Sequence, residues 1–156
     1  MRKIITLSLI FSISSLICQT EEIDLFKLYK ELHTNPELSY QEFETSEKLA
    51  LILEEIGYEV TRNIGGNGVV ALLKNGEGKT VMLRADMDGL PVEEKTGASY
   101  ASTKKAINPD GKEVYTMHAC GHDVHMSVLI GAAEYLYKSK SSWKGNLLLV
   151  LEPAEE

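Results

Sequence analysis

Hydrophobic residues recur along the first part of the chain at the spacing of an α-helix. Leu25, Leu28 and Leu32 fall on one face of a helix predicted over residues 24–33, and Asn35-Pro36 ends it. Polar residues occupy the opposite face, as in a helix that packs on a domain by one side. We therefore expect this helix to be a packing element.

A second helix is predicted from its start and stop signals. Ser39 and Glu42 have the spacing of a capping box, and Leu38 and Phe43 occupy the positions of the hydrophobic staple that accompanies one. An apolar stripe then continues until Gly57 ends the helix. This helix too is expected to serve packing.

Short apolar segments bounded by turn-forming residues follow. Strands are predicted at residues 58–62, 69–74 and 80–85, and the last two are expected to pair as an antiparallel hairpin across the turn at 75–79. The glycine-rich segment 65–68 lacks the spacing of a phosphate-binding loop, so it is read as a plain turn.

The second half of the chain adds a long polar loop, a helix and a strand. Residues 92–116 are read as a loop that has room for a hairpin, and the pattern after Gly121 predicts an internal helix, buried on two faces. The stripe on its first face consists of Val124, Val128, Leu129, Ala132, Ala133 and Leu136; Met126 and Ile130 lie on its second. Trp143 is expected to pack against the domain. The apolar run 147–151 predicts a strand buried on both faces, so the fold class is α/β.

Composition and charge narrow the class of protein. The chain has 156 residues, of which 44% are hydrophobic and 25% charged, which excludes disordered and collagen-like chains. The net charge is −7, and no basic block is present beyond Lys104-Lys105, so a nucleic-acid partner is not expected. A small molecule or peptide is the expected partner.

Residues 1–18 have the order of parts of a secretory signal peptide. Arg2-Lys3 precede an apolar segment that reaches Ile17; its 14 residues fall short of the roughly 20 that a membrane-spanning helix requires. The protein is therefore expected to be exported, to the periplasm or the medium. A lipoprotein anchored through Cys18 is less favoured, because bulky Ile17 precedes it. Cleavage after residue 18 leaves Cys120 as the one cysteine and a net charge of −9, from 14 basic and 23 acidic residues.

The densest candidate chemistry is the stretch 117–125, which holds three histidines, a cysteine and an aspartate. Gly121 frees the backbone angles between Cys120 and His122, so that both side chains can turn toward one ion. His125 follows His122 by three residues of helix, so a Cys120/His122/His125 zinc site is a further possibility.

Carboxylates follow two of the predicted strands. Asp86 and Asp88 come at the end of one strand, where Asp86 either takes part in a site or pairs with Arg84. Glu155 and Glu156 come after the last strand, beyond a proline, and are expected to reach one cleft together. Ligand sites of open α/β sheets lie at the carboxyl ends of strands.

Three ordered segments carry a family resemblance. Residues 83–91 (LRADMDGLP), 117–123 (MHACGHD) and 153–156 (PAEE) resemble the signature segments of the metal-dependent aminoacylase/amidohydrolase family, which includes hippurate hydrolases and indoleacetyl-amino-acid hydrolases. Residues 33–39 are also similar to the N-terminal segment of that family. The resemblance implies a three-layer, mixed-sheet metallopeptidase catalytic domain, of which residues 19–156 form the N-terminal part.

The resemblance also implies roles for individual residues. Cys120, His122 and Glu156 match metal ligands, Glu155 matches the catalytic carboxylate, and Asp88 matches the acid that supports the site. The implied activity is hydrolysis of the amide bond of N-acyl amino acids with two divalent metal ions. Ligand chemistry favours zinc but also admits manganese or cobalt. His118 and His125 match no certain ligand and are read as supporting or surface residues.

The sequence departs from the family in two respects. Glu152 stands where members usually have glutamine, and the chain stops at Glu156, before two further histidine ligands and an inserted dimerisation domain of the family. The resemblance thus implies that this chain is part of a longer enzyme and is inactive by itself. It also implies that the full-length enzyme forms a homodimer. Two alternatives stay open: a hydrolase in which His122 or His118 activates Cys120 as nucleophile, and a metal-binding module without catalysis.

Overall fold

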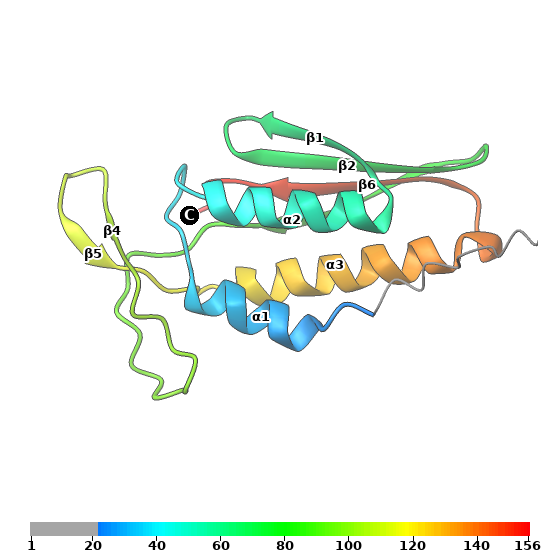
Figure 1. The fold of residues 1–156 in the computed structure, drawn as a ribbon. Coiled ribbons are helices and arrows are strands. Elements are labelled where there is room, and N and C mark those ends of the chain that lie inside the picture. The colour runs from blue at the N-terminus through cyan, green and yellow to red at the C-terminus, as the bar shows by residue number, and fades with distance from the viewer. Residues whose placement is uncertain (1–21) are drawn as a thin grey trace, which may run out of the picture.

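The computed structural model describes residues 22–156, so the predicted signal peptide, with Cys18, lies outside the described residues. The described part of the chain folds into helices on one side of a mixed sheet, with a small hairpin at one end (Figure 1). The elements are α1 (Leu25–Thr34), α2 (Phe43–Ile56), β1 (Glu59–Ile64), β2 (Gly68–Asn75), β3 (Thr80–Asp86), β4 (Lys105–Ile107), β5 (Glu113–Tyr115), α3 (His122–Lys138), the 3-10 helix η1 (Lys140–Ser142) and β6 (Gly145–Glu152). None of the helices among residues 22–156 is long and apolar enough to cross a membrane.

The four-stranded sheet has the order β1-β2-β6-β3, which corrects one strand pairing. The predicted hairpin of β2 with β3 is wrong, because β6 lies between them, antiparallel to β2 and parallel to β3. Leu149 of β6 is in register with Ala71 on one side and Leu83 on the other. The most apolar strand therefore occupies the interior of the sheet. The antiparallel hairpin of this sheet is β1–β2, across the turn at residues 65–67.

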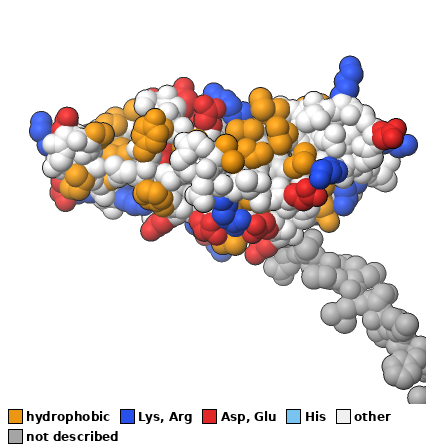
Figure 2. Space-filling model, turned by 90° about the horizontal axis from the view of Figure 1, so that it is seen from above, with side chains coloured by type: hydrophobic (Ala, Val, Ile, Leu, Met, Phe, Trp, Pro, Cys, Tyr) orange, Lys and Arg blue, Asp and Glu red, His pale blue; other side chains and the backbone are white. Residues whose placement is uncertain are grey.

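Burial of β6 alternates. Leu147, Leu149 and Leu151 are buried in the core that also contains residues of α2 and α3, whereas Leu148 and Val150 on the outer face are half-buried. The prediction of burial on both faces is thus right for the inner face alone. Figure 2, which views the sheet side of the molecule, shows hydrophobic side chains gathered between charged ones.

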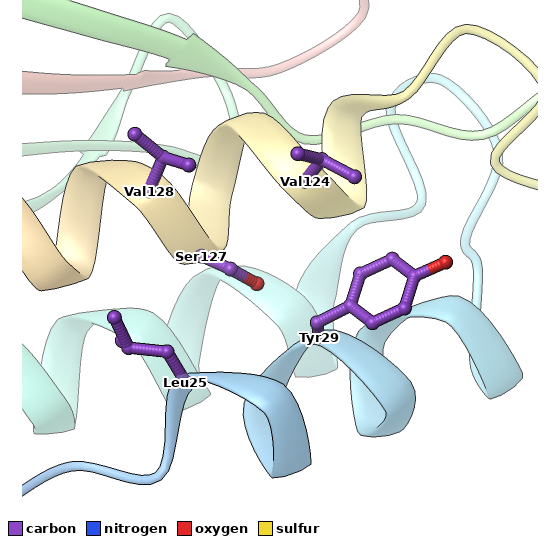
Figure 3. Close-up of a pocket in the computed structure, with 5 residues that line it drawn as sticks. All are labelled: Leu25, Tyr29, Val124, Ser127 and Val128. Carbon is purple, nitrogen blue, oxygen red and sulfur yellow. The ribbon is translucent and has the colours of Figure 1, made fainter.

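Helix α3 packs on the sheet by one face and against α1 by another. Its buried residues include Met126 and Ile130, and Leu129 and Ala133 of the predicted stripe are buried as well. Val124 and Val128 are exposed, so the expectation of an internal helix is wrong at these two positions. These two valines line a shallow apolar hollow of about 170 Å³ between α1 and α3 (Figure 3). Its other lining residues are Leu25, Tyr29 and Ser127.

The capping box predicted for α2 does not form. The helix begins at Phe43, which is exposed, and Glu42 makes no capping hydrogen bond through its side chain. The carboxylate of Glu37 instead accepts hydrogen bonds from the amides of Glu44 (3.3 Å) and Thr45 (2.8 Å). A carboxylate from outside the helix therefore satisfies its free amides. The predicted hydrophobic staple does not form either, because Leu38 is buried whereas Phe43 faces solvent.

Other local predictions are confirmed. The first helix forms close to its predicted bounds, the long loop contains the hairpin β4–β5, and Trp143 packs half-buried against the core. The structure adds that Asp24 caps α1 by accepting from the amide of Lys27 at 2.9 Å. The α/β class with a mixed sheet is confirmed as well.

Candidate metal centre

Three chain segments meet at one edge of the sheet. Because β3 and β6 run parallel, their carboxyl ends lie at the same edge, where Asp88 follows one strand and Glu155 and Glu156 follow the other. Helix α3 begins at that edge with His122, and Cys120 lies just before it. The structure therefore brings together the five residues that the sequence singled out.

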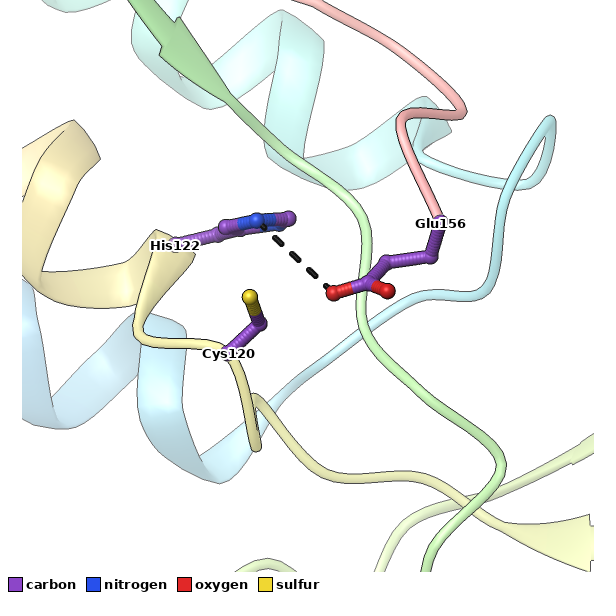
Figure 4. A group of neighbouring side chains, drawn as sticks. All are labelled: Cys120, His122 and Glu156. Atoms are coloured by element: carbon purple, nitrogen blue, oxygen red, sulfur yellow. Dashed lines mark ion pairs between the residues drawn. The ribbon is translucent and has the colours of Figure 1, made fainter.

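Cys120, His122 and Glu156 form one group that can hold a cation (Figure 4). One ligand atom from each lies within 4.8 Å of the others, and His122 Nε2 is 3.9 Å from Glu156 Oε1. Ligand atoms on one tetrahedral zinc ion lie roughly 3.3–3.8 Å apart, so small side-chain adjustments suffice. Gly121, with φ +83°, adopts the left-handed conformation that turns Cys120 back toward His122.

The imidazole of His122 is already oriented for this role. Its Nδ1 lies 2.8 Å from the backbone carbonyl oxygen of Asp88, which can only accept, so Nδ1 carries the proton. Nε2 is then left with its lone pair directed at the carboxylates. Metal-binding histidines are commonly fixed by such a bond through the other ring nitrogen.

A second group shares His122. It contains Asp86 and Glu155, and Glu155 Oε2 lies 3.6 Å from His122 Nε2. Asp86 also forms an ion pair with Arg84, which reaches Glu152 at 3.1 Å. The predicted pairing of Asp86 with Arg84 is confirmed, and Asp86 also lies beside the other metal-capable side chains.

Asp88 joins the segments together. Its Oδ2 accepts from the Ser39 hydroxyl at 2.7 Å and from the Glu156 amide at 3.0 Å. Burial tends to raise the pKa of Asp88, but these hydrogen bonds outweigh it and the pKa is lowered, so the group is a carboxylate at neutral pH. Its Oδ1 is buried without a hydrogen-bond partner and lies 3.5 Å from His122 Nδ1.

These residues fit a divalent metal. A thiol, an imidazole with a free Nε2 and several carboxylates converge, and the unpartnered Asp88 Oδ1 adds negative charge beside them. The Glu156 carboxylate, which the Cys120 thiol meets, raises the pKa of that thiol. A cation bound between the two would reverse this effect, since coordination deprotonates a thiol. The raised pKa also weighs against Cys120 as a free nucleophile.

The other histidines of the stretch belong to neither group, although the centroid of the His125 ring is 6.0 Å from that of His122. His118 is buried, neither ring nitrogen has a partner, and burial lowers its pKa to about 4, so it is neutral. His125 is exposed and belongs to neither metal-capable group among residues 22–156. The groups that the structure forms draw on Glu155 and Glu156 instead of His125.

Sequence reasoning missed a buried ionic cluster next to the site. His33 lies between two carboxylates, with Nδ1 2.6 Å from Asp123 Oδ2 and Nε2 3.1 Å from Glu94 Oε1. Asp123 directly follows His122, so this cluster anchors the start of α3. His33 and Asp123 fall in two family-like segments, but separations of 90 and 61 residues left no local signal that His33, Asp123 and Glu94 would meet.

Comparisons with known proteins agree with this geometry. The model of peptidase family M20/M25/M40 matches residues 82–156. A thermostable carboxypeptidase 2 of Saccharolobus solfataricus is 42% identical over 85% of this chain and 32% of its own length. A hippurate hydrolase of Campylobacter jejuni is 44% identical over 83% of this chain and 31% of its own.

A solved structure matches as well. The Bacillus subtilis YXEP protein, a dinuclear metal-binding peptidase from the M20 family, superposes with a TM-score of 0.73 at 36% identity, over 84% of this chain and 34% of its own. The chain spans about a third of the length of the curated relatives it matches. The three signature segments thus meet at one metal-capable edge, and over residues 82–156 the chain matches the model of peptidase family M20/M25/M40 and is similar in fold to a solved member.

Proposed function

We propose that the protein is a metallohydrolase that cleaves the amide bond of N-acyl amino acids, and that this chain supplies one part of its dinuclear site. The carrying observation is His122, whose Nδ1 is held by the Asp88 carbonyl so that Nε2 faces Cys120, Glu155 and Glu156. The hydrolase and peptidase names of the relatives support the reaction class. The hippurate hydrolase favours N-acyl amino acids as substrates.

The residues of the site have different proposed roles in metal binding and proton transfer. Cys120, His122 and Glu156 would hold an ion, which we propose to be zinc or manganese. When bound, divalent ions polarise the amide carbonyl and make water more acidic. Glu155 takes the proton of the attacking water and returns it to the leaving amine. Its side chain is 41% exposed at the edge of the site, where a substrate can reach it.

Asp88 has a positioning role in this proposal. Its backbone carbonyl fixes the His122 ring, and its carboxylate fixes the amide of Glu156, so one residue holds two ligand-bearing segments at a set distance. Outer partners of this kind keep ligands in the orientation that the ion needs.

The test is Glu155→Gln in the complete protein, with N-benzoylglycine, N-acetyl amino acids and dipeptides as substrates. The variant should retain metal, measured by elemental analysis, and lose hydrolysis by a factor of about 10² to 10⁴. If chelated protein stays active and alkylation of Cys120 abolishes activity, the cysteine hydrolase is the correct reading. If the unmutated protein binds metal but cleaves none of the substrates, the metal-binding module is.

Export and dimerisation are proposed on narrower grounds. Residues 1–18 alone support export, and N-terminal sequencing of protein recovered outside the cytoplasm tests it: an intact Met1 there would refute cleavage. A homodimer of the complete protein rests on the family resemblance, and sedimentation equilibrium tests it.

A further inference from the structure

Glu42 is a completely buried carboxylate that no signature segment contains. Its exposed fraction is 0%, although charged side chains are rarely buried without partners. Its Oε1 accepts from the backbone amide of Ala154 at 2.8 Å, and its Oε2 accepts from Asn67 Nδ2 at 3.0 Å. Both oxygens are thus engaged, one with the turn between β1 and β2 and one with the segment after β6.

The amide that Glu42 holds lies at a critical point of the backbone. Strand β6 ends at Glu152, Pro153 has no N–H to donate, and Ala154 is the first amide that can be anchored. Ala154 adopts φ +55°, a left-handed conformation that residues other than glycine rarely adopt and that persists only where the surroundings enforce it. Glu155 and Glu156 follow directly.

The segment is therefore fixed from two sides by buried carboxylates. Glu42 holds the Ala154 amide, and Asp88 holds the Glu156 amide at 3.0 Å. Glu155 lies between these two anchors. Removing the Glu42 anchor leaves the segment held only at Glu156, by Asp88 and by the Ser39 hydroxyl, which lies 3.4 Å from the Glu156 carbonyl oxygen.

We propose that Glu42 is a positioning residue of the metal centre: by holding Ala154 in its left-handed conformation it directs Glu155 and Glu156 toward His122. Asn67 assists by orienting the Glu42 carboxylate. The inference rests on the proposed function only for its effect on turnover, since the effects on backbone order and metal binding do not require a particular substrate.

The experiment compares four variants of the complete protein. Glu42→Ala removes the acceptor, Glu42→Gln keeps an acceptor for the Ala154 amide, and Asn67→Ala removes the orienting donor. The matched control is Glu44→Ala, a carboxylate two residues along the chain whose side chain is 82% exposed and pairs weakly with Lys104 at 3.8 Å.

Three measurements are made on each variant. Hydrogen exchange of the Ala154 amide is compared with that of Leu149 in the middle of β6, the dissociation constant for Zn²⁺ is measured by competition with a chromophoric chelator, and kcat and KM are determined for the best substrate. A purely structural role would raise exchange at Leu149 and Ala154 together, because both would follow global unfolding.

For Glu42→Ala we expect faster exchange at Ala154 with little change at Leu149, and Zn²⁺ affinity lower by about 10- to 100-fold. We expect kcat to fall by about 10²-fold with KM little changed, since misplacement of a reacting group by about 1 Å costs that much. Glu42→Gln and Asn67→Ala should fall between Glu42→Ala and the wild type, and Glu44→Ala should match the wild type.

The proposal is overturned if Glu42→Ala keeps Ala154 protection and Zn²⁺ affinity within about twofold of the Glu44→Ala control, or if Leu149 loses protection as fully as Ala154. If Glu42→Ala does not fold, Glu42→Gln and Asn67→Ala carry the same comparison. Wild-type protein that binds zinc but cleaves nothing would refute the proposed function, while the exchange and affinity results would still decide the role of Glu42.

Discussion

Replacing His33 by leucine removes the only cation between two buried carboxylates while roughly conserving side-chain volume. The side chains of His33, Asp123 and Glu94 are 9%, 3% and 0% exposed. Both ring nitrogens face carboxylate oxygens, and only the protonated imidazolium can donate to both at once. In His33→Leu, Asp123 and Glu94 would stay buried without the positive charge between them.

The size of the effect follows from what each carboxylate retains. Breaking a buried ion pair by removing one partner costs about 3–5 kcal/mol, because the other charge stays buried. Asp123 keeps the Val124 amide at 2.9 Å, and Glu94 keeps the Ser102 amide at 2.5 Å. These bonds place the expected loss at the lower end, about 3 kcal/mol of the free energy of unfolding.

The loss should depend on pH in a definite direction. Burial tends to lower the pKa of His33, but the hydrogen bonds to Asp123 and Glu94 outweigh it and the pKa is raised. A raised pKa means that the charged ring stabilises the fold fully below its unfolded pKa of about 6.5, and that this stabilisation is lost as pH rises through the folded pKa. The penalty of His33→Leu should therefore be larger at pH 6 than at pH 9.

Urea unfolding followed by the fluorescence of Trp143 measures this penalty. His33→Gln, which can still donate to one carboxylate, should lose less than His33→Leu. His125→Gln replaces an exposed histidine three residues after His122 and should change stability by less than about 0.5 kcal/mol. A His33→Leu penalty below about 1 kcal/mol, or one that grows with pH, would show that His33 is not a charged partner of the two carboxylates.

Two further predictions concern the ligand stretch. Gly121→Ala should cost about 1–3 kcal/mol of unfolding free energy and weaken Zn²⁺ binding, because alanine disfavours φ +83°. The cause is the backbone conformation, since the added methyl group would meet no atom within 4 Å. Unchanged urea unfolding and zinc titration would contradict this. Glu156→Gln should lower the pKa of Cys120, because the Glu156 carboxylate holds that pKa high. Alkylation of the metal-free thiol at pH 8, measured by mass spectrometry, should then be several-fold faster. An equal or slower rate would show that Glu156 does not control the pKa of the thiol.

The strand error has a specific physical cause. Hydrophobic patterning identifies β2, β3 and β6 correctly as strands, but the short turn-forming connection between β2 and β3 led to the expectation that these two pair. The long apolar run of β6 is the stronger signal, because a strand of five consecutive apolar residues lowers its free energy most between two neighbours. Hydrophobic patterning therefore predicts which segments are strands, whereas their order depends on which strand gains most from an interior position in the sheet.

The metal-capable residues were found by a different route from the fold. Motif resemblance identified Cys120, His122 and Glu156, and no periodicity in the sequence predicts that atoms 36 residues apart in the chain, such as those of Cys120 and Glu156, come within 4.8 Å. The polar partners of the site were missed because each acts over a long sequence separation. Glu42 lies 112 residues from Ala154, and the capping-box spacing offered a local use for its side chain that the fold does not take.

The connection from the end of α1 to the start of α2 gives these errors a common explanation. His33 contacts Asp123 beside His122, the Glu37 carbonyl accepts from the Gly89 amide at 2.7 Å, and Ser39 donates to Asp88. Glu42 completes the series at the segment after β6. All three ligand-bearing segments are therefore tied to ten consecutive residues. Local reasoning treated residues 33–42 as the boundary between two packing helices. The ligand-bearing segments also bond to one another through Asp88, so this polar connection is a second constraint on the distances between the ligands. At Glu42, its loss should weaken metal binding more than fold stability.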